Sequence, residues 1–571
     1  LSWTADGQAG NSYFDNNFVA ADQLEDTPTD SVDDGIGNYI TLVPNPVQTG
    51  LVLSEGNTHL TSSGSGIGDG GIKGNIFVSS GVWHWEVTAV NTATNAWTAG
   101  ITTVASGTGA GADEVDAVGD YAFVINGGQY WFDVNGTSGY PSRQSISSPN
   151  GRVFGFIYNY DAGTLNVYNA GLSGGVATLT SIPTTSEMTV VLRSSNAAHE
   201  FDCNFGQRPF VDGNLNNANA IATQNLPAPT IADGSQQFTP VIYTGTGSEL
   251  AITSLDFTPD FVWIKNRDAT DNHMLYDSVR GATKDLHSNT ADAETTTAQT
   301  LKSFDSAGFT LGTDVQVNTN TEDYVAWCWK AGGAASSNTD GSITSSVSAN
   351  TTAGFSIVSY TGTGANATIG HGLSVPPDMM IVINRDGSYS RRVYHSSNTA
   401  APETDALYLD QSSATVDNAT FWNDTAPTST VFSVGSDNGT NRSSNDLIAY
   451  CWSEVEGFSK FGSYTGNGVV DGPFVYTGFR PAFVMTKRTN STGDWRMHDN
   501  ARVPYNPFTG YLRASTSEAE LAGGDFDFLS NGFKIRNNGG EINASGGAFI
   551  YMAFAEHPFQ GADGVTQARA R

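Results

Sequence analysis

Short runs in which apolar and polar residues alternate recur along the chain and predict β-strands. GVWHWEVTAV (residues 81–90), DYAFVINGGQYWFDV (120–134) and EMTVVLRSS (187–195) show this period of two, which puts successive side chains on opposite faces of a strand. In GRVFGFIYNYDAGTLNVYNAG (151–171) two such runs flank an Asp-Ala-Gly turn, which predicts a β-hairpin. Several strands at this spacing predict an antiparallel sandwich over residues 62–214.

Beyond residue 236 the same order of sequence motifs occurs three times. A Tyr-Thr-Gly turn occurs as VIYTGTG (241–247), VSYTGTG (358–364) and GSYTGNG (462–468). Each copy continues with an apolar run after a proline and closes on an aromatic strand, YVAWCWK (324–330), LIAYCWS (447–453) or FIYMAFA (549–555). Such a unit exceeds the roughly 20–50 residues of solenoid repeats. It is typical of an array of small domains, each expected to bury its own core.

Together these patterns predict an all-β, multi-domain chain in which helix is a minor component. We expect an N-terminal arm (residues 1–61), an antiparallel sandwich (62–214), a linker with prolines (215–236) and three homologous small β-sandwich domains (237–334, 335–456 and 457–571). Each domain has room for about six to eight strands, whose order does not follow from the pattern. A loose stretch (332–346) separates copies one and two, and the joint between copies two and three (454–460) is tight. Because short joints limit independent motion, we expect a fairly rigid rod or cluster in the C-terminal half.

The composition fits turn-rich β structure and limits the classes of partner. Glycine supplies 64 of the 571 residues, and charged residues make up only 15%. The 57 acidic residues outnumber the 26 basic ones, which gives a formal net charge of -31. Because such a field repels nucleic-acid phosphates and anionic membrane surfaces, we expect no nucleic-acid partner. No run of 18 apolar residues occurs, so we expect no membrane insertion.

The three cysteines show neither a disulfide framework nor the spacing of a zinc site. Cys328 and Cys451 fall at equivalent places in copies one and two, where copy three has Ala553. A position that accepts Cys or Ala is small and buried. We therefore predict a structural role for these cysteines.

The central segment of each copy carries a histidine, an arginine and an aromatic residue. One hypothesis is a repeated ligand-binding patch, in which arginine supplies hydrogen-bond donors and the aromatic ring supplies a stacking face. The alternative is that these side chains bond backbone groups inside a fold that repeats. The patch would hold His273, Tyr276 and Arg280 in copy one, Arg392, Tyr394 and His395 in copy two, and Trp495, Arg496 and His498 in copy three.

The segment NGGQYWFDVNGTSGY (residues 126–140) is the best candidate for a glycan site. Flat aromatic faces stack on sugar rings, while short polar groups bond the hydroxyls. Alternation puts Tyr130 and Trp131 on opposite faces of a strand, so at least one of these faces belongs to the core. The candidate set is Trp97, Tyr130, Trp131, Asp133, Asn135 and Tyr140.

The sequence holds no catalytic pattern. Glycoside hydrolases need two carboxylates roughly 5–9 Å apart, and Glu86 has no partner within sequence reach. Nucleophile-elbow, HExxH and P-loop motifs do not occur either. We expect no enzymatic activity, no cofactor and no metal site. Bound calcium stays open as an alternative because loops such as DATDNH (268–273) are rich in oxygen ligands, although their spacing is irregular.

Two segments of the predicted sandwich resemble the SPRY domain, a concanavalin-like β-sandwich. Trp83, Trp85, Glu86 and Val87 match its GKWYWEV-type first strand. Gly155, Asp161, Gly163, Thr164, Leu165 and Tyr168 match its later GDVIGVALDLDAGTLSFYKNG-type hairpin. The resemblance implies a concanavalin-like fold for this region.

Nearly the whole chain resembles large virion proteins of tailed phages, especially marine ones, which are described as tail fibres or adhesins. The resemblance rests on DTPT (26–29), the SPRY-like region, CNFGQRPF (203–210), LPAPTI (226–231) and the motifs of the first copy. It implies a non-enzymatic protein of the virion surface. Its partners would be other virion proteins, further copies of itself in a homo-oligomer such as a trimer, and a host surface glycan or protein.

Two other functions stay open: a capsid decoration protein, and a carbohydrate-active depolymerase on the same scaffold. The chain has no collagen-like or coiled-coil stalk, unlike many fibres. Across the three copies the turn and strand framework recurs more faithfully than the loops between. This indicates a duplicated building block rather than three copies of one binding site.

Overall fold

The computed structural model divides the chain into two compact units, unit 1 (Leu1–Pro227) and unit 2 (Ala228–Arg571). The division falls within the segment predicted as a linker. Most of the predicted N-terminal arm lies outside the described residues. The structure describes residues 39–42, 51–54, 57–62, 72–74, 76–92, 97–103, 120–134, 137–146, 148–169, 172, 175–194, 198–211, 218–222, 231, 233–529, 531–555, 559–560 and 567–568.

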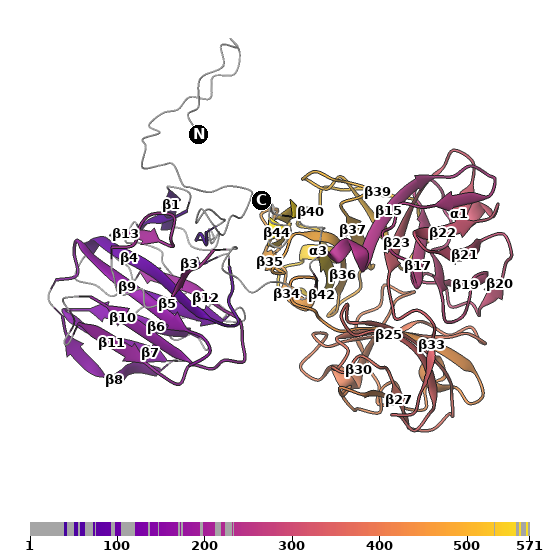
Figure 1. The fold of residues 1–571 in the computed structure, drawn as a ribbon, viewed down its shortest axis with the longest axis horizontal. Coiled ribbons are helices and arrows are strands. Elements are labelled where there is room, and N and C mark those ends of the chain that lie inside the picture. Colours follow the sequence, from indigo (N-terminus) through magenta and orange to yellow (C-terminus); the bar gives the residue numbers. More distant parts are fainter. Residues whose placement is uncertain are drawn as a thin grey trace, which may run out of the picture. The chain divides into compact units, whose positions relative to one another are not determined.

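Unit 1 is a β-sandwich of two sheets (Figure 1). One sheet has the order β1-β2-β13-β4-β9-β10-β11 with β14 beside β4, and the other has the order β3-β12-β5-β6-β7-β8. The strands are β1 (Leu51–Ser54), β2 (His59–Ser62), β3 (Ile72–Lys73), β4 (Val82–Thr92), β5 (Trp97–Thr103), β6 (Asp120–Asn126), β7 (Gln129–Val134), β8 (Thr137–Ser145), β9 (Arg152–Asn159), β10 (Thr164–Tyr168), β11 (Val176–Leu179), β12 (Met188–Ser194), β13 (His199–Asn204) and β14 (Asn219–Ala220).

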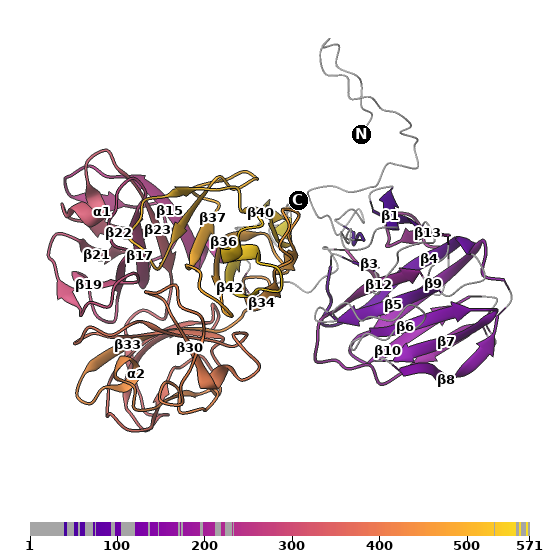
Figure 2. The same cartoon turned by 180° about the vertical axis from the view of Figure 1, so that it is seen from behind.

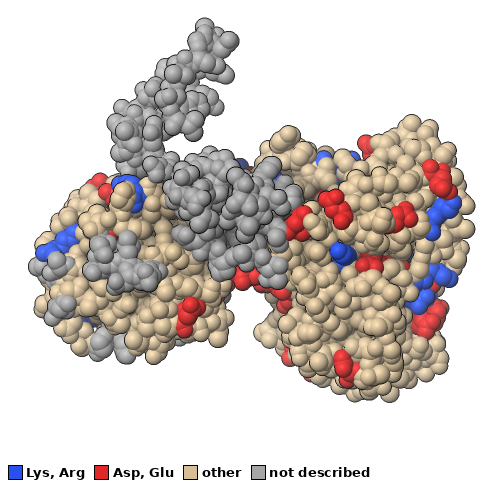
Figure 3. Space-filling model, in the orientation of Figure 1, with Lys and Arg blue, Asp and Glu red and all other residues tan. Residues whose placement is uncertain are grey.

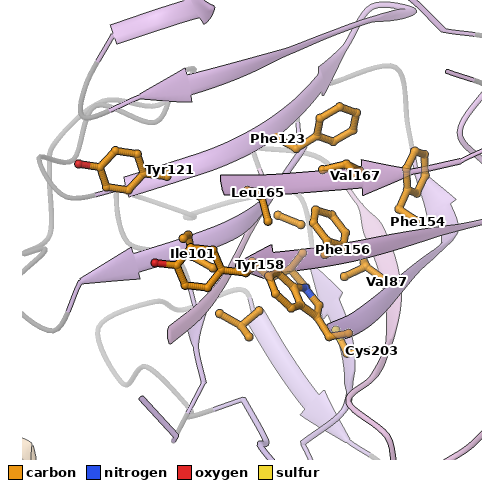
Figure 4. Close-up of a cluster of buried hydrophobic side chains, with 14 of the residues drawn as sticks. Val87, Ile101, Tyr121, Phe123, Phe154, Phe156, Tyr158, Leu165, Val167 and Cys203 are labelled. Atoms are coloured by element: carbon orange, nitrogen blue, oxygen red, sulfur yellow. The ribbon is translucent and has the colours of Figure 1, made fainter. Parts of the chain in front are cut away.

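The predicted sandwich and its hairpin are confirmed. β9 and β10 pair antiparallel around the turn at Gly163, and β4 pairs antiparallel with β9. Alternation along β4 buries Trp83, Trp85 and Val87, and the Trp85 ring stacks on Phe156 at 5.1 Å between centroids. Figure 4 shows this part of the core, with side chains from both sheets. The sandwich also takes in β1 and β2, so it begins before residue 62, the predicted start.

Unit 2 contains three repeats built on one plan (Figures 1 and 2). Repeat one has the strands β15 (Phe238–Thr244), β16 (Leu250–Ile252), β17 (Phe261–Asn266), β18 (Met274–Asp277), β19 (Lys284–His287), β20 (Thr295–Thr296), β21 (Leu301–Asp305), β22 (Gly308–Leu311) and β23 (Asp323–Trp329). Its main sheet has the order β15-β23-β17-β18-β19-β20, and a small sheet has the order β16-β22-β21.

Repeats two and three follow the same order of strands in their main sheets, while the small sheet has the order β27-β32 in repeat two and β35-β41-β40 in repeat three. In repeat two the strands β24 and β25 add to the outer side of β26 in the main sheet. The strands are β24 (Ser336–Asn338), β25 (Ser345–Asn350), β26 (Phe355–Thr361), β27 (Ala367–Gly370), β28 (Met379–Asn384), β29 (Arg392–His395), β30 (Asp405–Tyr408), β31 (Val416–Asp417), β32 (Val431–Val434), β33 (Asp446–Trp452), β34 (Ser459–Thr465), β35 (Phe474–Tyr476), β36 (Pro481–Arg488), β37 (Arg496–Asp499), β38 (Gly510–Arg513), β39 (Leu521–Ala522), β40 (Phe526–Leu529), β41 (Gly532–Ile535) and β42 (Ala548–Ala555), with the pair β43 (Phe559–Gln560) and β44 (Gln567–Ala568) after them.

The helices of unit 2 are short and occupy equivalent places. Each repeat has one four-residue α-helix before its aromatic strand: α1 (Val315–Asn318), α2 (Asn438–Asn441) and α3 (Gly540–Asn543). Two 3₁₀ turns complete the helical structure of the described residues, η3 (Gly234–Gln236) and η4 (Pro402–Thr404). The prediction that helix is a minor component of an all-β, multi-domain chain is confirmed.

Alternation along the aromatic strands sends side chains into two different cores. On β23, Tyr324, Ala326 and Cys328 face the core of repeat one, whereas Trp327 and Trp329 enter a central core shared by all three repeats. Strands β33 and β42 divide their residues in the same way. Cys328, Cys451 and Ala553 are fully buried at equivalent positions, as predicted.

Each copy buries a core of its own, as expected, and the central core is an additional one that the expectation did not include. It combines Phe261, Trp327 and Trp329 of repeat one with residues of both other repeats. Phe261 stacks on Tyr450 of repeat two at 4.3 Å between ring centroids, and Trp327 packs edge-on against Phe483 of repeat three at 5.8 Å. One face of each main sheet would meet water if its repeat stood alone. The cluster predicted from the short joints is therefore a body in which each repeat contacts the other two.

Candidate functional site

The Tyr-Thr-Gly turn that marks each repeat is held from inside by the short helix of the same repeat. A tyrosine hydroxyl donates to a carbonyl oxygen of that helix in every case. The pairs are Tyr243 with Val317 (2.8 Å), Tyr360 with Thr440 (2.6 Å) and Tyr464 with Ile542 (2.9 Å).

A buried asparagine at the end of each helix bonds the next residues of the turn. In repeat two the Asn441 side-chain oxygen accepts from the amide of Thr363 (2.7 Å), and its amide group donates to the carbonyls of Ala365 and Gly435 (2.6 and 2.7 Å). Asn318 and Asn543 do the same in repeats one and three. We call these three residues the clamp asparagines.

The glycines of the motif are explained by the same clamp. A Cβ on Gly362 would lie 2.3 Å from the carbonyl oxygen of Arg442, and Gly364 has a φ of 72°, in the left-handed region that favours glycine. The most repeated motif of the chain thus closes a turn within each repeat. Its tyrosine, glycines and asparagine all have partners inside the fold.

From one equivalent position, each repeat also donates a side-chain hydrogen bond to the backbone of a neighbouring repeat. The donor precedes the second strand of the central hairpin, and the acceptor is the carbonyl at the end of the strand that follows in the neighbour. His273 Nε2 bonds the carbonyl of Arg513 (3.0 Å), Arg391 Nε bonds that of His287 (3.0 Å), and Trp495 Nε1 bonds that of Tyr408 (2.8 Å). Three different side chains serve here because each carries an N–H group in reach.

His273 makes this contact as a neutral ring. Trp263 Nε1 donates to its Nδ1 (2.9 Å), so the proton lies on Nε2, which donates to Arg513. Burial lowers the pKa of His273 well below its usual range, and the charge of Lys265 lowers it further. At neutral pH the His273 ring is therefore uncharged, as the contact between repeats one and three requires.

The contact between repeats one and two is a buried charge network. Arg280 pairs with Asp277 of its own repeat, and the Tyr450 hydroxyl of repeat two donates to Asp277 Oδ2 (2.8 Å). Glu294 joins Arg280 (3.1 Å) to Arg385 of repeat two (2.8 Å). Although burial opposes its charge, Arg280 keeps a raised pKa because Asp277 and Glu294 are close. The pKa of Glu294 is lowered, since Arg385 and Arg280 outweigh its burial.

The contact between repeats three and one reproduces this network with different partners. Arg502 pairs with Asp499 (2.6 Å), and Trp327 Nε1 of repeat one donates to Asp499 Oδ2 (3.1 Å) in the place of the Tyr450 hydroxyl. Glu520 joins Arg502 (2.7 Å) to Arg267 of repeat one (2.7 Å). Two of the three contacts thus share an Asp-Arg-Glu-Arg arrangement.

The contact between repeats two and three lacks this arrangement. His395 stands where the other contacts have Asp277 and Asp499, and its Nε2 bonds the carbonyl of Tyr551 (3.0 Å). The amide of Ser397 donates to its Nδ1 (3.1 Å), so the ring is neutral. Burial lowers the pKa of His395 to about 4. Lys487 adds a buried ammonium bonded to the carbonyl of Ser413 (2.8 Å), and burial lowers its pKa to about 8.

The predicted patch of histidine, arginine and aromatic residues is not one arrangement repeated three times. His273 precedes its strand, His395 ends its strand, and His498 is equivalent to Tyr276 and Tyr394. Arg392 is half-buried, and the rest are buried: His273, Tyr276, Arg280, Tyr394, His395, Trp495, Arg496 and His498. The contacts fit the alternative considered above, in which these side chains hold a repeated fold together.

The remaining members of that set pack within their own repeats. Arg392 pairs with Asp437 (3.0 Å) and lies over the ring of Tyr408 at 4.7 Å. Arg496 pairs with Asp525 and Glu541 and lies over Tyr511 at 4.2 Å. His498 packs against Phe508, Tyr511 and Phe526.

The candidate glycan residues lie mostly in the interior of unit 1. Trp97 and Tyr130 belong to its core, Asp133 is fully buried, and Trp131 packs with Ala122 and Val124 on the other face of the same sheet. Trp131 Nε1 donates to Asp133 (2.9 Å), and Arg143 covers its ring at 4.2 Å. Tyr140 is in β8, beside Phe132, and Asn135 lies outside the described residues. Because Trp97, Tyr130 and Trp131 are buried, their rings are not accessible for stacking on a sugar.

The remaining features are those considered for catalysis, metal binding or membrane insertion. Glu86 is buried and accepts a hydrogen bond from Asn204 (3.1 Å). Among the described residues, no group of three or more His, Cys, Asp or Glu side chains is placed to hold a metal ion. No helix in the described ranges is long and apolar enough to cross a membrane. On the face of unit 2 drawn in Figure 3, charged groups are scattered among a larger uncharged surface.

The folds define a multi-domain all-β protein in which a two-sheet sandwich is followed by three β repeats around a shared core. A protein-family model described as Domain of unknown function (DUF7483) matches residues 233–558. This match spans more than half of the chain and falls within unit 2. The chain belongs to this family, and one family domain comprises all three repeats.

Two solved structures resemble part of the chain at low identity. The PSpry domain of TRIM65 aligns with 29% of this chain and 92% of its own, at 16% identity and a TM-score of 0.24. Stonustoxin aligns with 29% of this chain and 27% of its own, at 16% identity and a TM-score of 0.23. None of the curated proteins compared matches this chain.

Proposed function

We propose that this chain is a non-enzymatic structural protein of a tailed-phage virion, exposed on the particle surface as a tail fibre or adhesin. The observation that carries the proposal is how the repeated residues of unit 2 are used. The tyrosines, glycines and clamp asparagines close turns, and the His, Arg and Trp side chains bond neighbouring repeats. The repetition thus builds a body and leaves the non-repeated loops for recognition.

The resemblance of the sequence to virion proteins of tailed phages supports the same proposal. It joins the SPRY-like region to the motifs of the first repeat in one chain. A body with a shared core suits attachment, because a rigid carrier holds its binding loops in place without an ordering cost at the moment of contact. Several such chains on one particle would add avidity to weak individual contacts.

Electron microscopy of the phage that encodes this chain tests the proposal. Virions decorated with antibody against unit 2 should carry label at the tail or its fibres, and soluble full-length chain should compete with virions for adsorption to host cells. Label confined to the head lattice would favour the capsid decoration protein instead. Virions without label, or release of sugars from host polysaccharide by the purified chain, would contradict a non-enzymatic surface protein.

A further inference from the structure

The loop between β37 and β38 exposes an aromatic side chain. Tyr505 is 81% exposed, and no other aromatic residue of the described ranges is among the exposed large hydrophobic side chains. Its neighbours Pro504, Asn506 and Pro507 are exposed too. A ring held in water adds little to the stability of the fold, so core packing does not account for it. We call residues 503–509 the Tyr505 loop.

The Tyr505 loop is fixed at both sides of the exposed ring. The Asn506 side chain donates to the carbonyl of Phe528 (2.8 Å) and accepts from the Phe528 amide (2.9 Å). Phe508 is buried, packs on Phe528 at 4.2 Å between centroids, and bonds the carbonyl of Phe526 through its amide (2.9 Å). The amide of Val503 bonds the carbonyl of Asp499 (3.3 Å). An aromatic ring on a braced loop loses little conformational freedom when it binds.

The equivalent loops of the other repeats offer no such ring. Residues 278–283 of repeat one contain no exposed position, and residues 396–404 of repeat two expose only Thr399 and Ala400. The exposed ring is therefore a feature of repeat three alone. This distinguishes it from the clamp and the contacts between repeats, which recur because the fold recurs.

The Tyr505 loop is also free of charge in a strongly acidic chain. The run VPYNPFTGYL, from Val503 to Leu512, holds no charged residue, although the chain has a net charge of -31. A flat ring beside prolines and the exposed Thr509 matches the apolar face and hydroxyl groups of a neutral sugar. An anionic sugar would meet the repulsion of the chain's net negative charge.

We infer that the Tyr505 loop binds a neutral glycan by stacking the Tyr505 ring on a sugar ring. The inference rests on the proposed function and gives that function a site and a ligand class. The loop would be the part of the adhesin that touches the host surface.

Full-length chain should be tested for binding to immobilised neutral oligosaccharides (glucans, mannans and galactans) and to sialylated and uronate-containing ones. We expect binding to a neutral member. Tyr505→Ala should weaken it about tenfold or more, whereas Tyr505→Phe and Tyr505→Trp should stay within about threefold because they keep the ring face. Val470→Ala, which trims a side chain that is 60% exposed in the same repeat, is the matched control and should leave binding unchanged.

Three results would overturn the inference: no binding to any neutral oligosaccharide, equal binding by Tyr505→Ala, or host-cell binding that resists periodate and is abolished by protease. Unfolding midpoints of the variants exclude misfolding, since an exposed ring should not affect them. Competition for virion adsorption separates the two proposals. If wild type and Tyr505→Ala compete equally, the glycan loop fails and the adhesin stands. If wild type does not compete, the adhesin itself fails.

Discussion

At the scale of residues, the repeated polar side chains serve to form hydrogen bonds with backbone groups. A buried carbonyl or amide without a partner costs about 1–3 kcal/mol, so a side chain that bonds several of them is hard to replace. The clamp asparagines illustrate this, because one amide group satisfies three backbone atoms around the Tyr-Thr-Gly turn.

Asn441→Ala should therefore lower the free energy of unfolding by about 1–3 kcal/mol, since it removes a buried hydrogen bond to the Gly435 carbonyl and two part-buried ones to the Thr363 amide and the Ala365 carbonyl. Chemical denaturation of the full chain measures the change. Asn366→Ala removes an exposed asparagine of the same repeat and should alter stability by about 0.5 kcal/mol or less. Equal effects of the two substitutions would show that the clamp is dispensable.

His395 gives a second prediction at this scale. Its pKa is about 4 in the folded chain and near 6.5 in the unfolded one, so its contribution is present above pH 6.5 and is lost as the pH falls toward 4. In His395→Gln, which keeps an N–H donor, the loss of stability between pH 7 and pH 4.5 should be about 2–3 kcal/mol smaller than in wild type. Urea unfolding at the two pH values tests this, and parallel losses would contradict it.

At the scale of elements, the alternation of residues was enough to predict the strands and the hairpin β9–β10. Comparison of the three copies also predicted that Cys328, Cys451 and Ala553 occupy one equivalent buried position. Alternation does not tell whether a face meets its own small sheet or a neighbouring repeat, because both surroundings are apolar. The central core and the charge networks therefore stayed hidden.

The comparison of segments by residue type failed for a related reason. His273, His395 and His498 look alike in sequence, yet strand register puts them at three different positions. The true equivalents, His273, Arg391 and Trp495, share only an N–H group. Register counted back from the Pro-anchored strands would have aligned them. In the candidate glycan segment Tyr130 and Trp131 are both buried, because aromatic residues that alternate on a strand pack on both of its faces.

The charge network between repeats one and two gives the prediction for this scale. Arg280→Ala leaves Asp277 buried without its cation and should cost about 3–5 kcal/mol of stability. Lys302→Ala breaks an exposed pair with Glu249 in the same repeat and should cost about 1 kcal/mol or less. The denaturant midpoints of both variants measure the two losses of stability. A small effect of Arg280→Ala would show that the network adds nothing to the contact.

At the scale of the whole molecule, unit 2 behaves as one body because the three main sheets share a core. Three separate domains would each expose Trp and Phe side chains on one face of a sheet, and burial of each such side chain is worth about 1.5–3 kcal/mol. The family domain matched by residues 233–558 spans the same three repeats. Covalent fusion of three copies thus gives a rigid carrier in which a single repeat is free to present a distinct loop.

Native-state hydrogen exchange of full-length Arg280→Ala tests this shared core most directly. The substitution lies between repeats one and two, and the loss of protection should reach the amides of β23, β33 and β42 to the same extent, repeat three included. Strands β4 and β9 of unit 1 serve as the internal control and should keep their protection. Loss confined to repeats one and two, with β42 as protected as in wild type, would contradict the shared core and restore three independent domains.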